Sequence, residues 1–157
     1  MPLGRSNAPR RYFTAQERAQ IVAAIGAAEA RTSGEIRLHV ERDVPAGGKA
    51  GGDPYARARE LFAKLGMHRT AQRNGVLVYL ATRTRCLAIV GDEGLHDKVG
   101  ETFWRDVVDA MLPHFASDRP ADGLAAGLAQ IGEKLRKHFP RQDGDVNELP
   151  DEISFRE

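Results

Sequence analysis

The sequence of 157 residues has a single cysteine, Cys86, which excludes an internal disulfide framework and any thiolate-rich zinc or iron–sulfur site. An excess of charge of one sign is also missing, because 23 lysines and arginines stand against 22 acids and leave a net charge of +1. So small a charge supplies no broad field for holding a nucleic acid or an anionic membrane. We therefore expect no nucleic-acid partner.

Long apolar runs are absent as well. The chain has no run of eighteen apolar residues, and its first residues hold no apolar segment long enough for a secretory signal. We expect no membrane span and, as the default, a cytoplasmic location. Hydrophobic residues nevertheless make up 41% of the chain, which is enough for one soluble domain with an ordinary core.

The two ends of the chain differ in charge from its middle. Residues 1–12 carry three arginines and no acid, and we predict that they form a flexible basic tail. Residues 141–157 carry six acids against two arginines, which predicts an acidic C-terminal tail. The folded domain should therefore span residues 13–140.

The first half of this domain shows one helix, one strand and a second helix. Thr14 and Glu17 have the spacing of a capping box, and apolar residues then recur at helical spacing, which predicts a helix over 15–30. Apolar and polar residues alternate over 35–41, as in a strand with one buried face near an edge of the sheet. A glycine-rich loop follows, and Asp53-Pro54 then predicts the start of a helix over 54–66.

The second half begins with two apolar runs, 76–81 and 86–90, joined by a short polar turn, and these predict an antiparallel hairpin. Apolar residues at four-residue spacing predict one helix that ends at Pro113, and a second stripe over 124–135 predicts another helix. The expected order is α-β-α-β-β-α-α. Because a helix connects the strands at 35–41 and 76–81, these should be parallel, in an α/β layered domain with a small mixed sheet.

This topology brings polar residues to one end of the sheet. The N-terminal ends of two parallel strands and the C-terminal end of the antiparallel third strand share an edge, so Glu35, Asn74 and Asp92 should converge there. Glu93 and Asp97 follow in the next turn and helix. Carboxylate, amide and carbonyl oxygens in this number are the ligands that calcium and magnesium require, so this end of the sheet is a candidate metal site.

A plainer interpretation of the same residues stays open. Asp92 can cap the following helix, Glu93 and Asp97 can favour its positive end, and Glu35 can pair with an arginine such as Arg73. Other features point to no chemistry. The glycine-rich loop lacks the spacing of a phosphate-binding loop, the histidines lack the spacing of zinc ligands, and Cys86 lies in an apolar strand as a core residue.

Several segments together resemble the TPM-domain family, which is named for a thylakoid lumen protein, a photosystem II repair protein and a nematode receptor-associated protein. The likeness lies in the order and spacing of NGVLVYLA at 74–81, AIVGDEGL at 88–95, MLPHF at 111–115 and GLAAG at 123–127. The segments at 13–14, 32–36 and 147–155 look like the soluble bacterial branch of that family.

The resemblance implies a three-layer α/β/α sandwich, calcium or magnesium binding in some members, and an acid phosphatase label. It carries metal-binding roles over to Asp92 and Asp97, whereas Glu35 and Glu93 rest on the topology argument. Many members also carry a signal peptide and a membrane anchor. This sequence shows neither, so it departs from the family at that point.

Two functions from different classes follow as expectations. The first is a divalent-cation-binding module, for calcium or magnesium, with a regulatory or protein-docking role toward an unknown protein partner. The alternative is a metal-assisted acid phosphatase acting on phosphomonoesters, in which Arg73 and Asn74 would lie beside the phosphate or the metal. The sequence predicts neither the ion nor the oligomeric state.

Overall fold

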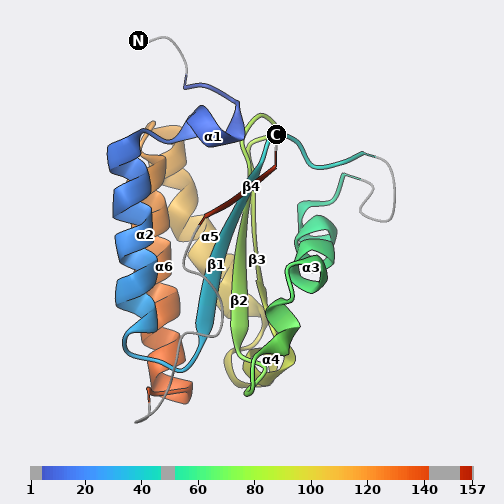
Figure 1. Ribbon diagram of the computed structural model, residues 1–157, viewed down its shortest axis with the longest axis vertical. Helices are drawn as coiled ribbons and strands as arrows, with labels where there is room; N and C mark the ends of the chain where they lie inside the picture. The colour runs from blue at the N-terminus through green and yellow to red at the C-terminus, as the bar shows by residue number, and fades with distance from the viewer. Residues whose placement is uncertain (1–4, 47–51, 142–152, 157) are drawn as a thin grey trace.

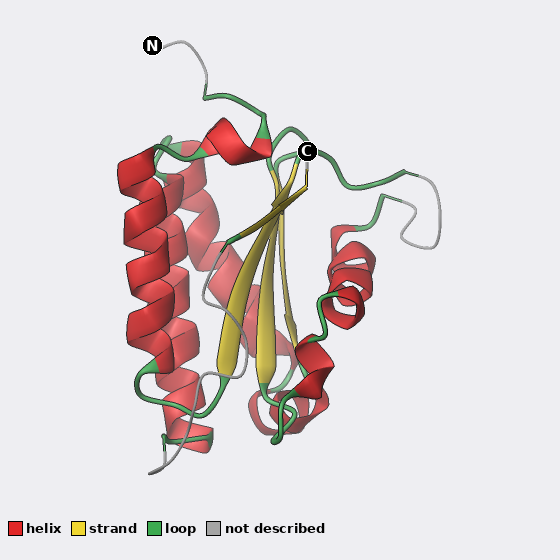
Figure 2. Cartoon of the chain, in the orientation of Figure 1, coloured by secondary structure: helices red, strands yellow, loops and turns green. Residues whose placement is uncertain are grey.

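The computed structural model describes residues 5–46, 52–141 and 153–156, and in it a sheet lies between two layers of helices (Figure 1, Figure 2). The strands are β1 (Glu35–Glu41), β2 (Gly75–Ala81), β3 (Cys86–Gly91) and β4 (Ser154–Arg156). The helices are α1 (Pro9–Tyr12), α2 (Ala15–Glu29), α3 (Pro54–Lys64), α4 (Glu93–Val99), α5 (Glu101–Ala116) and α6 (Pro120–His138), with a 3-10 turn, η1 (Met67–Arg69).

The described strands form one mixed sheet in the order β3-β2-β1-β4. β1 and β2 are parallel, and β2 and β3 are antiparallel, as the sequence predicts. Each strand alternates its side chains between the two faces, so β2 serves two separate cores. Val76, Val78 and Leu80 enter the larger core with α2, α5 and α6, whereas Leu77 and Tyr79 enter a smaller core with α3. The predicted three-layer sandwich is confirmed.

The N-terminal segment contains more structure than a flexible basic tail. Pro9 begins α1, a single turn, and Arg5 forms ion pairs with Glu17 and Asp118 at 2.5 and 3.0 Å. Residues 5–12 therefore pack against the domain, while residues 1–4 lie outside the described residues. The predicted helix over 15–30 is confirmed as α2, and the capping box of Thr14 and Glu17 forms in full.

The prediction that the strand at 35–41 lies near an edge of the sheet is wrong. β4 pairs with β1 in parallel, so β1 lies between β2 and β4. The pairing is favourable because Ile153 and Phe155 pack against the larger core, and the guanidinium groups of Arg10 and Arg18 lie over the Phe155 ring. The end of the predicted acidic tail is therefore part of the sheet, and residues 142–152 lie outside the described residues.

The single helix predicted to run up to Pro113 is in fact two helices. Gly100 separates α4 from α5 with φ of +77°, a left-handed conformation that glycine adopts at little cost. Pro113 does not end α5, which continues to Ala116. Proline removes one backbone donor, but Phe115 still packs against the larger core and holds the last turn. No helix in the described part of the chain is long and apolar enough to cross a membrane.

Two glycines should respond to alanine with opposite signs. A Cβ atom at Gly91 would lie 2.5 Å from Cζ2 of the buried Trp104, so Gly91→Ala should lower the free energy of unfolding by about 1–3 kcal/mol through overpacking. A Cβ atom at Gly26, inside α2, meets nothing within 4 Å. Gly26→Ala should therefore raise the free energy of unfolding by about 0.5–1 kcal/mol. Urea unfolding followed by circular dichroism measures both, and equal effects of the two substitutions would contradict this packing.

Candidate functional site

The backbone positions of the predicted rim residues agree with the topology argument. Glu35 of β1 lies opposite Gly75 of β2, and the backbone N–H of Asp92 donates to the carbonyl oxygen of Gly75 at 2.9 Å. Glu35, Asn74 and Asp92 therefore belong to one end of the sheet, on three neighbouring chain segments. We call this end, with Arg73, Glu93 and Asp97, the acidic rim.

The rim residues differ in exposure. Glu35, Asn74 and Asp92 are 2%, 1% and 5% exposed, whereas Glu93 and Asp97 on α4 face solvent. Burying a carboxylate removes it from water and is costly unless hydrogen bonds or a cation compensate. The buried acids therefore define the rim, and the exposed acids can change rotamer around it.

Asp92 makes the contacts that the plainer interpretation expects of a helix cap. Its Oδ1 accepts from the backbone N–H of Glu93 at 2.7 Å, at the N-terminus of α4. Its Oδ2 accepts from Nε of Arg73 at 3.2 Å, and Nη2 of Arg73 lies 4.0 Å from Oε2 of Glu93. The hydrogen bond to Asp92 and its negative charge raise the pKa of Arg73. In this arrangement a guanidinium is the cation beside the buried carboxylate.

The loop that carries Arg73 packs against the start of α4. The backbone N–H of Gly94 donates to the carbonyl oxygen of Arg73 at 2.9 Å. Asn74 is held by neighbouring hydroxyls, because its backbone N–H donates to Oγ1 of Thr70 at 3.3 Å and its Nδ2 donates to Oγ of Ser33 at 3.2 Å. Over the ranges 5–46, 52–141 and 153–156, no three histidine, cysteine or acidic side chains stand close enough to hold a metal. The metal role of the rim residues stays a prediction.

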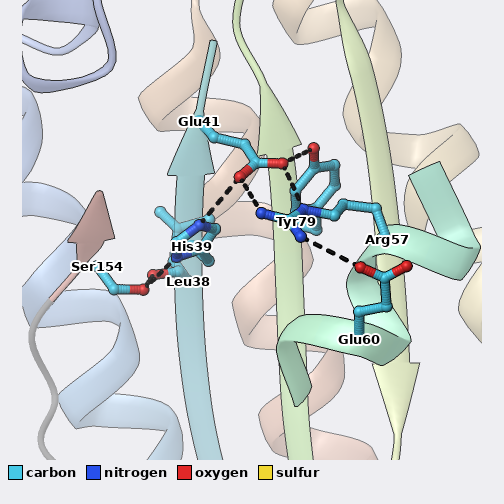
Figure 3. A network of polar contacts seen from close by, with 7 residues as sticks. All are labelled: Leu38, His39, Glu41, Arg57, Glu60, Tyr79 and Ser154. Atoms are coloured by element: carbon cyan, nitrogen blue, oxygen red, sulfur yellow. Dashed lines mark hydrogen bonds and ion pairs between the residues drawn. The ribbon is translucent and has the colours of Figure 1, made fainter. Parts of the chain in front are cut away.

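A second polar cluster, which the sequence analysis did not predict, lies at the opposite end of β1 (Figure 3). Glu41 receives two hydrogen bonds from Arg57 of α3, with Nε to Oε2 at 2.9 Å and Nη2 to Oε1 at 3.0 Å. The Tyr79 hydroxyl donates to Oε2 of Glu41 at 2.5 Å, and Nη1 of Arg57 donates to Glu60 at 3.2 Å. Glu41 and Arg57 are each 3% exposed, so this is a buried ion pair.

Burial alone would raise the pKa of Glu41, but its neighbours His39, Arg57 and Tyr79 outweigh that effect and lower the pKa to about 2. Burial and the adjacent carboxylate raise the pKa of Tyr79, which keeps its phenol protonated as a donor. The cluster therefore holds one negative and one positive charge over the whole physiological pH range.

His39 connects this cluster to the C-terminal strand. Its Nδ1 lies 2.7 Å from Oγ of Ser154 on β4, and its Nε2 lies 3.6 Å from Oε1 of Glu41. Serine, histidine and a carboxylate in a row are also the parts of a nucleophilic site. Here, however, the carboxylate is bound to Arg57, and the Ser154 hydroxyl donates to the carbonyl oxygen of Leu38 at 3.4 Å. The contacts fasten β4 to β1, and we assign this cluster a structural role.

The sequence signal for this cluster was present but was interpreted as a solvent face. The polar residues of β1 alternate with apolar ones, which is typical of a strand with one wet face. In the structure that face is closed, because His39 and Glu41 are 4% and 3% exposed. The partner arginine comes from α3, and only the fold brings it there.

Comparison with known proteins gives the family. The family model described as the TPM domain matches residues 7–134. No curated protein matches the chain. Among solved structures, the NMR structure of the BA42 protein from the psychrophilic bacterium Bizionia argentinensis is 37% identical, with a TM-score of 0.82 over 92% of this chain and 96% of that one.

Two more distant structures share the fold. The N-terminal domain of a protein from P. gingivalis is 18% identical, with a TM-score of 0.64 over 83% of this chain and 82% of that one. The N-terminal domain of the cg2496 protein from Corynebacterium glutamicum is 16% identical, with a TM-score of 0.58 over 78% of this chain and 74% of that one. With the family match over most of its length and the likeness to BA42, this chain belongs to the TPM-domain family.

Proposed function

We propose that this protein is a divalent-cation-binding module, for calcium or magnesium, whose acidic rim takes up the ion by releasing Arg73, in a regulatory or protein-docking role. One observation carries the proposal. Asp92 is 5% exposed and needs a positive partner, while the side chain of Arg73 beside it is 48% exposed. Arg73 can therefore move into water and leave the buried carboxylate to a harder cation.

The backbone of Arg73 supports a role beyond packing. Its φ is +52°, a left-handed conformation that a residue with a side chain adopts at a cost of about 1 kcal/mol or more. Such residues concentrate at functional sites. Here the conformation places the guanidinium beside Asp92 and the carbonyl oxygen beside Gly94.

The ion would be held by oxygen ligands from the rim. Asp92 and Glu35 would contribute buried carboxylates, Asn74 an amide oxygen, and Glu93 and Asp97 would turn in from the exposed face of α4. Calcium accepts six to eight such ligands in flexible geometry, and magnesium keeps several waters, so either ion suits a rim that is partly open to solvent. The bound charge would replace that of Arg73.

The test is a thermal scan of chelator-treated protein with added calcium or magnesium. An ion that binds only the folded state adds about 2.7 kcal/mol of stability at one hundred times its Kd, so the melting temperature should rise with ion concentration. Asp92→Asn keeps the helix cap but loses the charge, and it should weaken ion binding by about tenfold or more. Asp53→Asn is the matched control, because Asp53 caps α3 in the same way and lies outside the rim.

Displacement of Arg73 makes its own requirement. Arg73→Gln removes the competing cation and should tighten ion binding, whereas a second-sphere or phosphate-binding role predicts no such gain. An unchanged melting temperature at millimolar calcium and magnesium would remove the proposal. Equal ion affinity in Asp92→Asn and the unmodified protein would show that the rim acids serve only as helix caps and surface charge.

The alternative function, a metal-assisted acid phosphatase acting on phosphomonoesters, has one observation in its favour. Arg73 places a half-exposed guanidinium beside a buried carboxylate, and such groups stabilise the oxygens of a transferring phosphoryl group. We expect no turnover of an aryl phosphate above buffer with calcium, magnesium or manganese from acid to neutral pH. A metal-dependent rate that Asp92→Asn abolishes and Arg73→Gln depresses would reverse this choice.

A further inference from the structure

A groove of about 350 Å³ lies at the β3 edge of the sheet, away from the Glu41 cluster. Its floor is β3, and its walls come from the start of α3 and the middle of α5. The residues that carry the argument are Pro54, Tyr55, Leu87, Ile89, Trp104 and Arg105. We call it the edge groove.

β3 is the outermost strand of the described sheet, so the backbone on its outer side is available for pairing. The direction of each backbone group follows from the register. Asp92 is hydrogen-bonded to Gly75, so Val90 and Ala88 are the next residues that exchange hydrogen bonds with β2. The N–H and C=O groups of the residues between them, Leu87 and Ile89, point outward into the edge groove.

The side chains around this free edge suit an extended peptide with apolar residues. Tyr55 is 45% exposed at one wall, and the buried ring of Trp104 forms part of the other. Among the described residues, no acceptor meets the indole N–H of Trp104. Aromatic walls beside an open strand edge are how peptide-binding domains accept an added strand, with backbone hydrogen bonds for affinity and side-chain pockets for selection.

Charge at the two walls selects the occupant further. Arg105 lines the edge groove from α5, and the Arg59 guanidinium lies 5.2 Å from the centre of the Tyr55 ring on α3. Both arginines are exposed. The nearby acid Asp53 is already engaged, since its Oδ1 accepts from the backbone N–H groups of Tyr55 and Ala56. Carboxylates on the bound segment would therefore meet two cations.

From this edge, these walls and these charges we infer that the edge groove binds an extended segment of a partner protein, apolar at alternate residues and acidic between them, as an additional strand on β3. A second copy of this chain fits less well. Strands pair about 4.8 Å apart, but helices are about 10 Å wide, so the walls formed by α3 and α5 admit one strand more readily than a second β3 with its own helices. The inference does not depend on the cation proposed for the rim.

The experiment uses the full chain and a library of capped hexapeptides with valine, isoleucine, leucine or phenylalanine alternating with aspartate, glutamate, threonine or lysine. Binding is followed through fluorescence, because Trp104 is the one tryptophan in the sequence. We expect the tightest binders to be acidic. Arg105→Glu should weaken them by at least about tenfold, or about 1.4 kcal/mol. Lys137→Glu, an equal charge reversal at an exposed residue of α6, should leave them unchanged.

Amide hydrogen exchange identifies the binding mode. With peptide bound, the amides of Leu87 and Ile89 should become protected, whereas that of Ala88, already paired with Tyr79, should change little. N-methylation of the peptide should abolish binding at every second residue only. Protection elsewhere, N-methyl effects without this period, a preference for basic peptides, or a dimer in sedimentation that occludes β3 would each overturn the inference.

Discussion

Replacing Arg57 with alanine should lower the free energy of unfolding by about 3–5 kcal/mol, the largest effect that we expect from one substitution in this domain. The guanidinium donates twice to Glu41, and both side chains are 3% exposed. Without Arg57, the Glu41 carboxylate remains buried with too little positive charge beside it. Urea unfolding at neutral pH, followed by circular dichroism, measures the loss.

Two further variants separate the ion pair from general damage to α3. Glu60→Ala removes the more exposed partner of Arg57 and should cost less than about 1 kcal/mol, as for other partly exposed pairs. The double variant Glu41→Gln with Arg57→Met replaces the pair by groups of similar volume and should recover a large part of the loss. If Arg57→Ala costs no more than Glu60→Ala, the buried pair does not stabilise the fold as described.

The same cluster shows what local sequence patterns can predict. They located β1, β2, β3 and α2 within about a residue or two, because helical and strand periodicity and the capping box act over short stretches. They did not predict that the polar face of β1 is buried. That face is closed by Arg57 from α3 and by Tyr79 from a strand that reads as uniformly apolar, and this pairing depends on the tertiary fold.

β4 escaped prediction for a related reason. It has three residues, and His39 and Ser154 are separated by 115 positions along the chain. The alternation of Ile153, Ser154 and Phe155 is a weak strand signal, and it lies in a segment whose acidic composition favours a tail. A strand this short forms only because an existing edge, that of β1, pairs with it.

At the acidic rim, topology predicted more than side-chain chemistry. Strand direction alone was enough to bring Glu35, Asn74 and Asp92 to one end of the sheet. It could not predict which side chain faces which. The left-handed backbone of Arg73 directs the guanidinium to Asp92, where the sequence analysis had suggested Glu35 as a partner for it.

Lowering the pH should destabilise the domain through Glu41 in particular. The pKa of this carboxyl is about 2 in the folded protein against an ordinary value of 4.5, because Arg57, Tyr79 and His39 together outweigh the cost of burial. A depressed folded-state pKa gives stability that is complete above pH 4.5 and is lost as the pH falls toward 2. The difference corresponds to about 3 kcal/mol.

Urea unfolding between pH 7 and pH 2 tests this expectation, with the Glu41→Gln and Arg57→Met double variant as the reference that lacks the titrating group. The free energy of unfolding of the unmodified protein should fall more steeply below pH 4.5 than that of the reference, by about 3 kcal/mol in total. Other acids titrate in both proteins and cancel in the comparison. Parallel pH profiles would mean that Glu41 has an ordinary pKa, and that its bonds to Arg57 and Tyr79 are too weak to repay its burial.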